Sequence, residues 1–545
     1  MTPAAERERS ATMQYDYIIV GGGTAGCVLA NRLSADGRHS VLVLEAGPRD
    51  HSIWIHIPIG YAKTMFHPVL NWRFQTDPEP SMDDRRIYWP RGRCLGGSSS
   101  INGLIYVRGQ PEDYDRWAAL GNPGWGWKDV LPYFLRSEGN SRGASPYHGA
   151  DGPLACSDIG AKHELMEAII RAAGELAIPA NEDFNGARQE GVGYYQLFTR
   201  NGWRCSSATA YLRPAERRPN LRVETDAHAT RIVLEGRRAA GVSYRRGGSE
   251  TQARAMREVI VSAGALQSPQ LLQLSGIGPA ELLRSLGVPV AMDHPGVGEN
   301  LQDHLQLRAM YRCTRPITTN DDLASPWRKA RIGLQWLLRR SGPLAIGINQ
   351  GGLFARVMPD AVTPDVQFHF ATLSAELAGA KPHPWPGFTM SVCQLRPESR
   401  GRVRIRSRDP FEAPSIAPNY LTADGDRRCA VAGLKLARAL AATAALKPYV
   451  AAEYRPGPEA RSDEDLLAFA RSYGATIFHP AGTCKMGRDP MAVVDERLRV
   501  HGIGGLRVAD CSVMPNLVSG NTNAAAVMIA EKASDLILED AARAD

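Results

Sequence analysis

The chain has 545 residues, of which 43% are hydrophobic and 22% are charged, and its formal net charge is +7. This composition excludes a disordered chain, and the length suffices for two or more domains that each bury a core. The small basic excess argues against a nucleic-acid-binding protein, which would concentrate positive charge on one surface.

The nine cysteines are scattered without a C-x-x-C spacing, so we expect reduced thiols and no disulfide framework or metal site. HELME at 163–167 begins like a zinc-protease motif but lacks the second histidine. Residues 1–12 are polar and lack the apolar segment of a secretory signal, which predicts a loose tail, a start at Met1 or Met13, and a cytoplasmic protein. No uncharged stretch is long enough for a membrane span.

The first motif of the fold lies in residues 15–47, YDYIIVGGGTAGCVLANRLSADGRHSVLVLEAG. Apolar residues 17–20 and 41–44 predict two buried parallel strands, with a helix over 24–34 between them. The glycines of a G-x-G-x-x-G pattern are Gly21, Gly23 and Gly26. They permit a tight turn and close approach of a pyrophosphate, and Glu45 after the second strand can accept ribose hydroxyls. The motif predicts a dinucleotide site and leaves NAD and FAD open.

A second glycine-rich stretch is WPRGRCLGGSSSINGLIYVRG at 89–109. Gly97 and Ser98 belong to a run before Asn102 whose backbone N–H groups and hydroxyls suit a phosphate or the edge of a ring. A flexible linker is the alternative, but the apolar residues on both sides argue against it. Further along, residues 264–279, GALQSPQLLQLSGIGP, predict a turn from a strand into a helix.

Residues 324–342, ASPWRKARIGLQWLLRRSG, predict a helix that starts at Pro326 and stops at Gly342. The segment has several basic residues, two tryptophans and no acid. One interpretation is a surface helix whose leucines face the core of a cap domain. The other is a basic helix that docks peripherally on the inner face of the cytoplasmic membrane.

The last two motifs lie near the C-terminus. ATIFHPAGTCKMG at 475–487 holds His479 in a stiff turn, where it is either a reactive base or an ordinary loop histidine. Residues 505–537 predict a strand, Asp510, a loop and a helix with Asn523 at its start. Two other histidines, His304 and His369, are interpreted as structural.

These motifs, in this order, resemble the glucose–methanol–choline (GMC) family of FAD-dependent oxidoreductases. Residues 92–102 and 264–278 resemble its two signature segments, and the likeness runs from Tyr15 to the C-terminus. The sequences RGxxLGGSSSINGxxYVRG and HPxGTCKMG are most similar to those of bacterial choline and alkanol dehydrogenases.

The resemblance implies a binding site for FAD. The residues expected there are Gly21, Gly23, Gly26, Glu45, Gly97, Ser98, Asn102, Ala229 and Asp510. Ala229, on a strand predicted over 221–234, is expected near the adenine. Some relatives link FAD covalently through a histidine just before the equivalent of Asn102, where this chain has Ile101, so we expect noncovalent FAD.

The resemblance also implies the reaction, which is oxidation of an alcohol to an aldehyde with hydride transfer to flavin N5. His479 is then the base that takes the hydroxyl proton, and Asn523 is the second polar group, which steadies the developing oxyanion and also caps a helix. We expect activity to rise with pH near or somewhat above the ordinary histidine pKa of about 6.5. Phe478, which has no hydroxyl, favours apolar primary alcohols.

The expected architecture is an α/β protein of two domains. The FAD-binding domain, Rossmann-like around one parallel sheet, comprises residues 13–155, 215–310 and 470–545. The substrate-binding domain comprises residues 156–214 and 311–469 and is built on an antiparallel sheet. The sequence does not indicate an oligomeric state.

Several functions remain open at this stage. The leading one is an alcohol dehydrogenase that passes electrons to a quinone, and the nearest alternative is an oxidase that uses O2. A flavin-dependent lyase and a flavin-binding protein without catalysis are less favoured, because both His479 and Asn523 are present. The identity of the alcohol is open.

Overall fold

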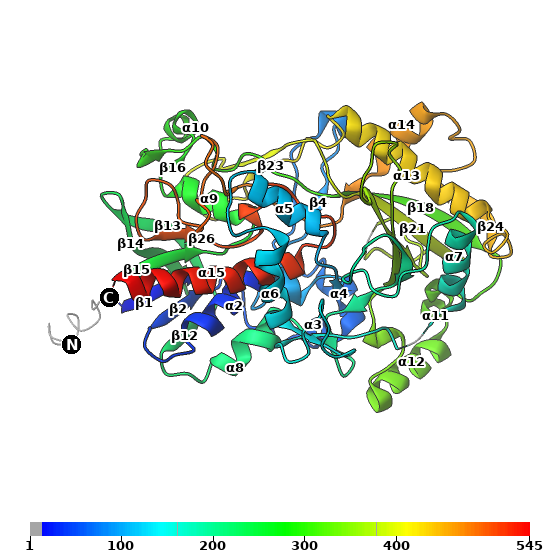
Figure 1. Cartoon of the computed structure of the whole chain (residues 1–545), viewed down its shortest axis with the longest axis horizontal. Helices are drawn as coiled ribbons and strands as arrows, with labels where there is room; N and C mark the ends of the chain where they lie inside the picture. The colour runs from blue at the N-terminus through cyan, green and yellow to red at the C-terminus, as the bar shows by residue number, and fades with distance from the viewer. Residues whose placement is uncertain (1–12, 161, 378, 545) are drawn as a thin grey trace.

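The computed structural model describes residues 13–160, 162–377 and 379–544. Two sheets of seven strands each organise this part of the chain, one toward the left and one toward the right in Figure 1. The helices that accompany them are α2 Thr24–Leu33, α3 Ile53–His56, α4 Tyr61–Thr64, α5 Pro111–Ala119, α6 Trp127–Ser137, α7 Glu164–Glu175, α8 Arg213–Ala215, α9 Gln267–Leu274, α10 Ala280–Ser285, α11 Thr319–Ala324, α12 Pro326–Arg339, α13 Asp424–Ala442, α14 Asp463–Tyr473 and α15 Asn523–Ala544.

The first sheet has the strand order β12-β2-β1-β15-β14-β13, with β26 also paired to β15. Its strands are β1 Met13–Val20, β2 Val41–Leu44, β12 Leu221–Glu224, β13 Ala227–Glu235, β14 Arg238–Arg246, β15 Ser249–Val261 and β26 Leu506–Val508. The strands β12, β2, β1, β15 and β26 pair in parallel. This is the arrangement expected of a nucleotide-binding domain.

This sheet differs from the prediction in two ways. It is mixed, because β14 and β13 pair antiparallel. The single strand predicted over 221–234 is two strands, β12 and β13. Asp226 separates them with a left-handed backbone (φ 55°), and its N–H donates to the carbonyl of Gly47 (2.9 Å), so the chain turns there and leaves the parallel sheet.

Helices α2 and α15 pack together beside this sheet, and α15 crosses its front in Figure 1. Their apolar faces are buried, including Val28 and Leu29 on α2 and Ile529 on α15. A fully buried carboxylate, Glu531 of α15, is bound by Arg32 of α2 (2.7 Å). The pairing compensates the cost of burying this charge and fixes α15 against the nucleotide-binding helix.

The second sheet is antiparallel, with the strand order β24-β18-β21-β20-β19-β8 and with β25 paired to β18. Its strands are β8 Gly191–Tyr194, β18 Leu305–Cys313, β19 Asn349–Ala355, β20 Val366–Ala371, β21 Gly387–Gln394, β24 Val450–Arg455 and β25 Ala475–Thr476. The predicted α/β fold class with an antiparallel cap sheet is confirmed. Strands β18 and β25 start within the ranges predicted for the FAD domain, so the domain limits stay a prediction.

The remaining strands form two-stranded sheets. They are β3 Phe74–Gln75, β4 Tyr88–Trp89, β5 Ile105–Tyr106, β6 Glu138–Asn140, β7 Leu154–Cys156, β9 Gln196–Leu197, β10 Thr199–Arg200, β11 Trp203–Arg204, β16 Ile277–Gly278, β17 Met292–Asp293, β22 Arg402–Arg404 and β23 Ser415–Ala417. Among the described residues, no helix is both long and apolar enough to cross a membrane. The cysteines are all unpaired, and every one except Cys511 is buried.

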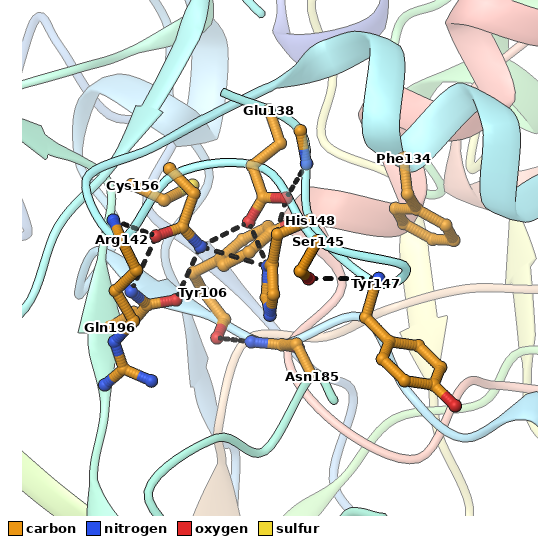
Figure 2. A network of polar contacts seen from close by, with 12 residues as sticks. Tyr106, Phe134, Glu138, Arg142, Ser145, Tyr147, His148, Cys156, Asn185 and Gln196 are labelled. Atoms are coloured by element: carbon orange, nitrogen blue, oxygen red, sulfur yellow. Dashed lines mark hydrogen bonds and ion pairs between the residues drawn. The ribbon is translucent and has the colours of Figure 1, made fainter. Parts of the chain in front are cut away.

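A buried polar network connects residues from the two predicted domains (Figure 2). His148 contacts Glu138 through Nδ1 (2.9 Å) and Asp183 through Nε2 (2.8 Å). Arg108, which is fully buried, forms an ion pair with Glu138. The two neighbouring carboxylates raise the pKa of His148 to about 9, in spite of its burial. His148 is therefore charged at neutral pH and stabilises the contact between these segments.

Candidate active site

One cavity of about 310 Å³ is lined both by the ends of β1 and β2 and by strands β18, β20 and β21 of the second sheet. The residues predicted to bind FAD line it, with one exception. Gly26 lies beneath the surface, where a Cβ would come within 1.8 Å of the carbonyl oxygen of Gly21. The predicted nucleotide site and the predicted substrate site thus share one cavity.

The glycines form a cradle that only bare backbone can make. Gly21 has φ +103°, a conformation that L side chains rarely adopt. Gly97, from the second glycine-rich stretch, has φ +51°, and a Cβ there would lie 2.7 Å from Cα of Gly23. Backbone amides at the N-terminus of α2 are therefore accessible to a phosphate, and these residues fit FAD.

Glu45 occupies the predicted ribose position. Its carboxylate accepts hydrogen bonds from the N–H groups of Gly22 (2.9 Å) and Gly47 (2.8 Å), which fix both oxygens at the cavity wall. Burial raises its pKa to about 7. Each oxygen keeps a lone pair that can accept a hydrogen bond from a ribose hydroxyl.

Two other predicted residues connect separate segments of the cavity wall. The carboxylate of Asp510 accepts from the N–H of Gly264 (2.8 Å) and from Ser268 Oγ (2.6 Å) of the second signature segment. Asn102 Oδ1 accepts from Arg204 (2.7 Å). These contacts hold both residues at the cavity that would receive the flavin.

Arg91 donates hydrogen bonds both to Ser98 and to the turn that carries His479. The hydroxyl of Ser98 accepts from Arg91 Nη2 (2.6 Å), and Arg91 Nη1 also donates to the carbonyl of Phe478 (2.7 Å). Arg91 thereby connects the serine-rich stretch to the residue before His479.

The backbone places His479 at the cavity surface. Phe478 has a left-handed backbone (φ 73°), which is uncommon for a bulky residue and turns the chain sharply before the histidine. The N–H of His479 donates to Asp303 Oδ1 (2.7 Å), and Tyr420 donates to the other oxygen of Asp303. The imidazole is 7% exposed and lines the cavity.

A second histidine determines the tautomer of His479. Burial lowers the pKa of His304 to about 4, so at neutral pH its ring carries one N–H. That N–H is on Nε2, because Nε2 faces the carbonyl oxygen of Leu395 (2.9 Å). Nδ1 of His304 is then an acceptor and lies 3.0 Å from Nδ1 of His479, which must donate. His479 consequently has its lone pair on Nε2.

The amide that faces this lone pair belongs to Asn521. Its Nδ2 lies 3.3 Å from Nε2 of His479, and its Oδ1 accepts from Gln367 Nε2 (3.1 Å), which orients the amide. The predicted partner, Asn523, lies at the start of α15, where its Oδ1 accepts from Thr24 Oγ1 of α2 (3.0 Å). Both asparagines line the cavity, but the side chain that the structure brings to His479 is Asn521.

The electrostatics of this group keep His479 uncharged. Burial, followed by His304, His369 and Arg91, lowers its pKa well below the ordinary histidine value. This direction disfavours the expectation that activity rises near or above pH 6.5, which stays a prediction. The neutral, proton-accepting form already predominates at lower pH.

The sequence interpretation missed His304 and Asn521. His304 was assigned a structural role because nothing in the local sequence shows that β18 pairs with β25, which brings it to His479. Asn521 stands two residues before Asn523 in GNTNA, so the prediction found the motif and named its second asparagine; the catalytic role of Asn523 stays a prediction.

Comparison with known proteins identifies the family. Two family models described as GMC oxidoreductase match the chain, one over residues 15–306 and the other over residues 397–530. The chain belongs to the GMC oxidoreductase family. It is 44% identical to the "Alcohol dehydrogenase [acceptor]" of Pseudomonas putida over 529 residues, which covers 96% of each protein. It is also 44% identical to the mitochondrial choline dehydrogenase of Mus musculus, covering 96% of this chain and 89% of that protein.

A solved structure agrees. The formate oxidase of Aspergillus oryzae, in a structure that addresses modification of its FAD, superposes with a TM-score of 0.91 and 27% identity over 98% of this chain and 99% of that one. The predicted family, fold class and FAD cofactor are confirmed. Family and relatives together indicate an FAD-dependent alcohol oxidoreductase, as the sequence predicted.

Proposed function

We propose that this enzyme oxidises a small primary alcohol to the aldehyde, with His479 as the base and Asn521 as the group that steadies the substrate oxygen. The observation that carries the proposal is the contact between Nδ1 of His304 and Nδ1 of His479 (3.0 Å), from which the tautomer of His479 follows. A neutral imidazole with its lone pair on Nε2, at the surface of a cavity that fits FAD, is suited to accept a hydroxyl proton.

The two side chains divide the work at the substrate oxygen. His479 Nε2 accepts the hydroxyl proton, while Nδ1 keeps its hydrogen bond to His304. Asn521 Nδ2 can donate to the oxygen as negative charge develops there, since Gln367 already holds the other end of the amide. FAD, when bound, supplies the hydride acceptor. Ile477 and Phe478 line the cavity next to His479 and offer apolar surface that would keep water away from this position.

The test is anaerobic mixing of the FAD-loaded enzyme with a panel of primary alcohols, followed by flavin absorbance. The proposal requires bleaching by at least one alcohol and formation of the matching aldehyde. A panel that leaves the flavin oxidised would overturn it, and turnover of a cyanohydrin or a fatty acid without net redox change would favour a lyase.

We propose further that FAD is held noncovalently by Gly21, Gly23, Glu45, Asn102 and the other cavity residues. Ile101, 6% exposed and on the cavity wall, has no nucleophilic atom. Acid or heat denaturation should release free FAD into the supernatant. Flavin that stays with the precipitated polypeptide would contradict this.

For the electron acceptor we propose a membrane quinone, reached by docking of the segment 324–342 on anionic lipid. The leucines of α12 do not face a core. Its exposed apolar residues are Trp327 (86% exposed), Leu334 (55%), Leu337 (60%) and Leu338 (71%). Trp336, on the opposite side, is buried against Trp203 and anchors the helix at the lower right edge of the molecule in Figure 1.

The positive charge of α12 favours a membrane with anionic lipids. Lys329, Arg331 and Arg339 of α12 are exposed, and α12 has no acidic residue. Each basic side chain near an anionic bilayer contributes roughly 1 kcal/mol. A second copy of the chain would bring the same positive charge, so it is disfavoured as an occupant of this face.

Flotation with phosphatidylglycerol vesicles and with phosphatidylcholine vesicles tests the docking. We expect binding to the anionic vesicles at low salt, and loss of that binding when Lys329, Arg331 and Arg339 are replaced by Gln. The matched control removes the same charge from exposed residues elsewhere, namely Arg217, Arg237 and Arg284. Equal binding by both triple variants, or no binding to anionic vesicles, would contradict the proposal and would leave O2 as the favoured acceptor.

A further inference from the structure

Strand β18 turns one face to the cavity and the other to the core of the cap sheet. Leu307 and Ala309 are buried in the cluster that includes Leu434 of α13. Gln306 and Arg308 alternate with them and line the cavity. Across the sheet, Arg308 is paired with Ser391 of β21, which is paired in turn with His369 of β20. Arg308 therefore belongs to the sheet face that bounds the substrate side of the cavity.

The guanidinium of Arg308 is incompletely satisfied. Its Nε donates to Gln306 Oε1 (3.2 Å), and among the described residues no partner is found for its two terminal nitrogens and no carboxylate lies within ion-pair distance. Two other arginines differ, namely Arg91, which also lines the cavity, and Arg204, which binds the lining residue Asn102. Arg204 donates to Ile55, Ser99, Asn102 and Pro58, and Arg91 donates to Ser98 and Phe478.

Arg308 nevertheless keeps its charge. Burial lowers its pKa to about 10, which is still well above neutral pH. The side chain is partly exposed at the cavity wall, and a cation withdrawn from water without a counter-charge is costly, so proteins normally compensate it with an anion. The two free terminal nitrogens present the planar fork that matches a carboxylate.

Negative charge is confined to the nucleotide side of the cavity. The only acidic residues among its described lining are Glu45 and Asp510. Both are held by backbone N–H groups, Glu45 by Gly22 and Gly47, and Asp510 by Gly264 and Ser512. An alcohol with a quaternary ammonium group would meet Arg308 and find no carboxylate on the sheet face.

We propose that Arg308 binds a carboxylate of the substrate, so that the alcohol oxidised at His479 is a hydroxy acid. This inference rests on the proposed function for the position of the hydroxyl. His304, which contacts His479, and Arg308 are four residues apart along an extended chain, about 13 Å between Cα atoms. The hydroxyl and the carboxylate are then separated by a chain of several carbons, which Ile477 and Phe478 can cover.

Alcohols that carry a negative, a neutral or a positive group provide the first test. The FAD-loaded enzyme is assayed with ω-hydroxyhexanoate, its methyl ester, n-hexanol and choline, using an artificial electron acceptor. We expect kcat/KM for the acid to exceed that for the ester by about ten- to a hundredfold, as for a hydrogen-bonded charge pair. Choline should be the poorest of the four.

Variants assign the preference to Arg308. Arg308→Gln should lower kcat/KM for the acid about ten- to a hundredfold, mainly through KM, and change that for the ester less than about threefold. Arg308→Lys keeps the charge but loses the planar fork of two nitrogens. Its kcat/KM for the acid should lie between those of the wild type and Arg308→Gln. The control is Arg312→Gln on the same strand, where the exposed guanidinium lies over Trp385 (4.9 Å) and outside the cavity lining.

A binding measurement separates this inference from the proposed function. Hexanoate lacks the hydroxyl, and its Kd for the FAD-loaded enzyme can be followed by the change in flavin absorbance. We expect binding that weakens about tenfold or more in Arg308→Gln and is unchanged in Arg312→Gln. Oxidation of ester and n-hexanol without preference for the acid, or hexanoate binding that Arg308→Gln leaves unchanged, would overturn the role of Arg308 and leave alcohol oxidation standing. Failure of every alcohol together with Arg308-dependent hexanoate binding would overturn the proposed reaction alone.

Discussion

His304 and His479 face each other through their Nδ1 atoms, 3.0 Å apart, with their ring planes at 87°. Two nitrogens in such a contact cannot both carry a proton or both lack one. Since Leu395 requires the proton of His304 on Nε2, the contact fixes the proton of His479 on Nδ1. The proposed base is thus oriented by a residue that does not touch the reacting atoms.

The positioning role of His304 predicts different outcomes for two replacements. His304→Phe keeps the ring volume but removes the acceptor, and we expect it to lower the rate of flavin reduction about ten- to a hundredfold. His304→Gln can accept from His479 and donate to Leu395, so it should recover part of the rate. Stopped-flow flavin reduction measures both, and equal rates in the two variants would show that the hydrogen bond does not matter.

The lowered pKa of His479 predicts a flat pH profile. A histidine with a depressed pKa is neutral above that pKa. The base should therefore be competent from about pH 6.5, the ordinary histidine pKa, up to about pH 9. The limiting rate of flavin reduction at saturating alcohol should change less than about threefold over this range. A sigmoidal rise with its midpoint above about 6.5 would contradict the structure and restore the expectation from the sequence.

The two asparagines should separate catalysis from cofactor binding. Asn521→Ala removes the amide beside His479 and should lower flavin reduction by about two to three powers of ten, with FAD content retained. Asn523→Ala breaks the contact with Thr24 and should lower FAD affinity more than the rate of the loaded enzyme. The checks are single-turnover reduction and FAD retention after gel filtration. The reverse pattern would reinstate Asn523 as the catalytic partner.

The buried network of Figure 2 predicts how stability depends on pH. The pKa of His148 is raised to about 9, so its contribution is complete below its ordinary pKa of about 6.5 and is lost as pH rises through 9. Glu138 and Asp183 have lowered pKa values, so their contribution is present above their ordinary pKa values and is lost as pH falls. The network therefore stabilises most at mildly acidic pH.

Replacement of His148 tests this network. His148→Gln should lower Tm clearly at about pH 6, where the wild-type His148 is charged. It should lower Tm less at about pH 9, the raised pKa of His148, because the wild-type charge is already being lost there. Thermal unfolding at the two pH values measures the difference. Exposed His51→Gln is the control and should leave both Tm values unchanged. A loss in Tm that does not depend on pH would mean that His148 contributes by packing alone.

The elements that depend on local pattern were predictable. The glycine fingerprint, helix α2 and Glu45 lie within one βαβ unit, so their spacing along the chain dictates their relative positions. The order of the motifs then indicated the family and FAD. The antiparallel cap sheet could also be inferred, because its strands β20 (VQFHFA) and β21 (GFTMSVCQ) alternate apolar and polar residues.

Features that depend on long-range pairing were not predictable. The tautomer of His479 requires β25 to lie beside β18, and nothing in either short strand specifies that partner. The turn at Asp226 ended a strand that propensity would have continued. The free terminal nitrogens of Arg308 are likewise a property of the assembled cavity, since a sequence does not show which arginine lacks a counter-charge.

The most direct test of the account is single-turnover reduction of bound FAD by a primary alcohol, without oxygen, in the wild-type enzyme and in His479→Ala. The variant should retain FAD and reduce it about two to four powers of ten more slowly, as for loss of a general base. An alanine variant that binds FAD and reduces it as fast as the wild type would contradict the assignment of His479.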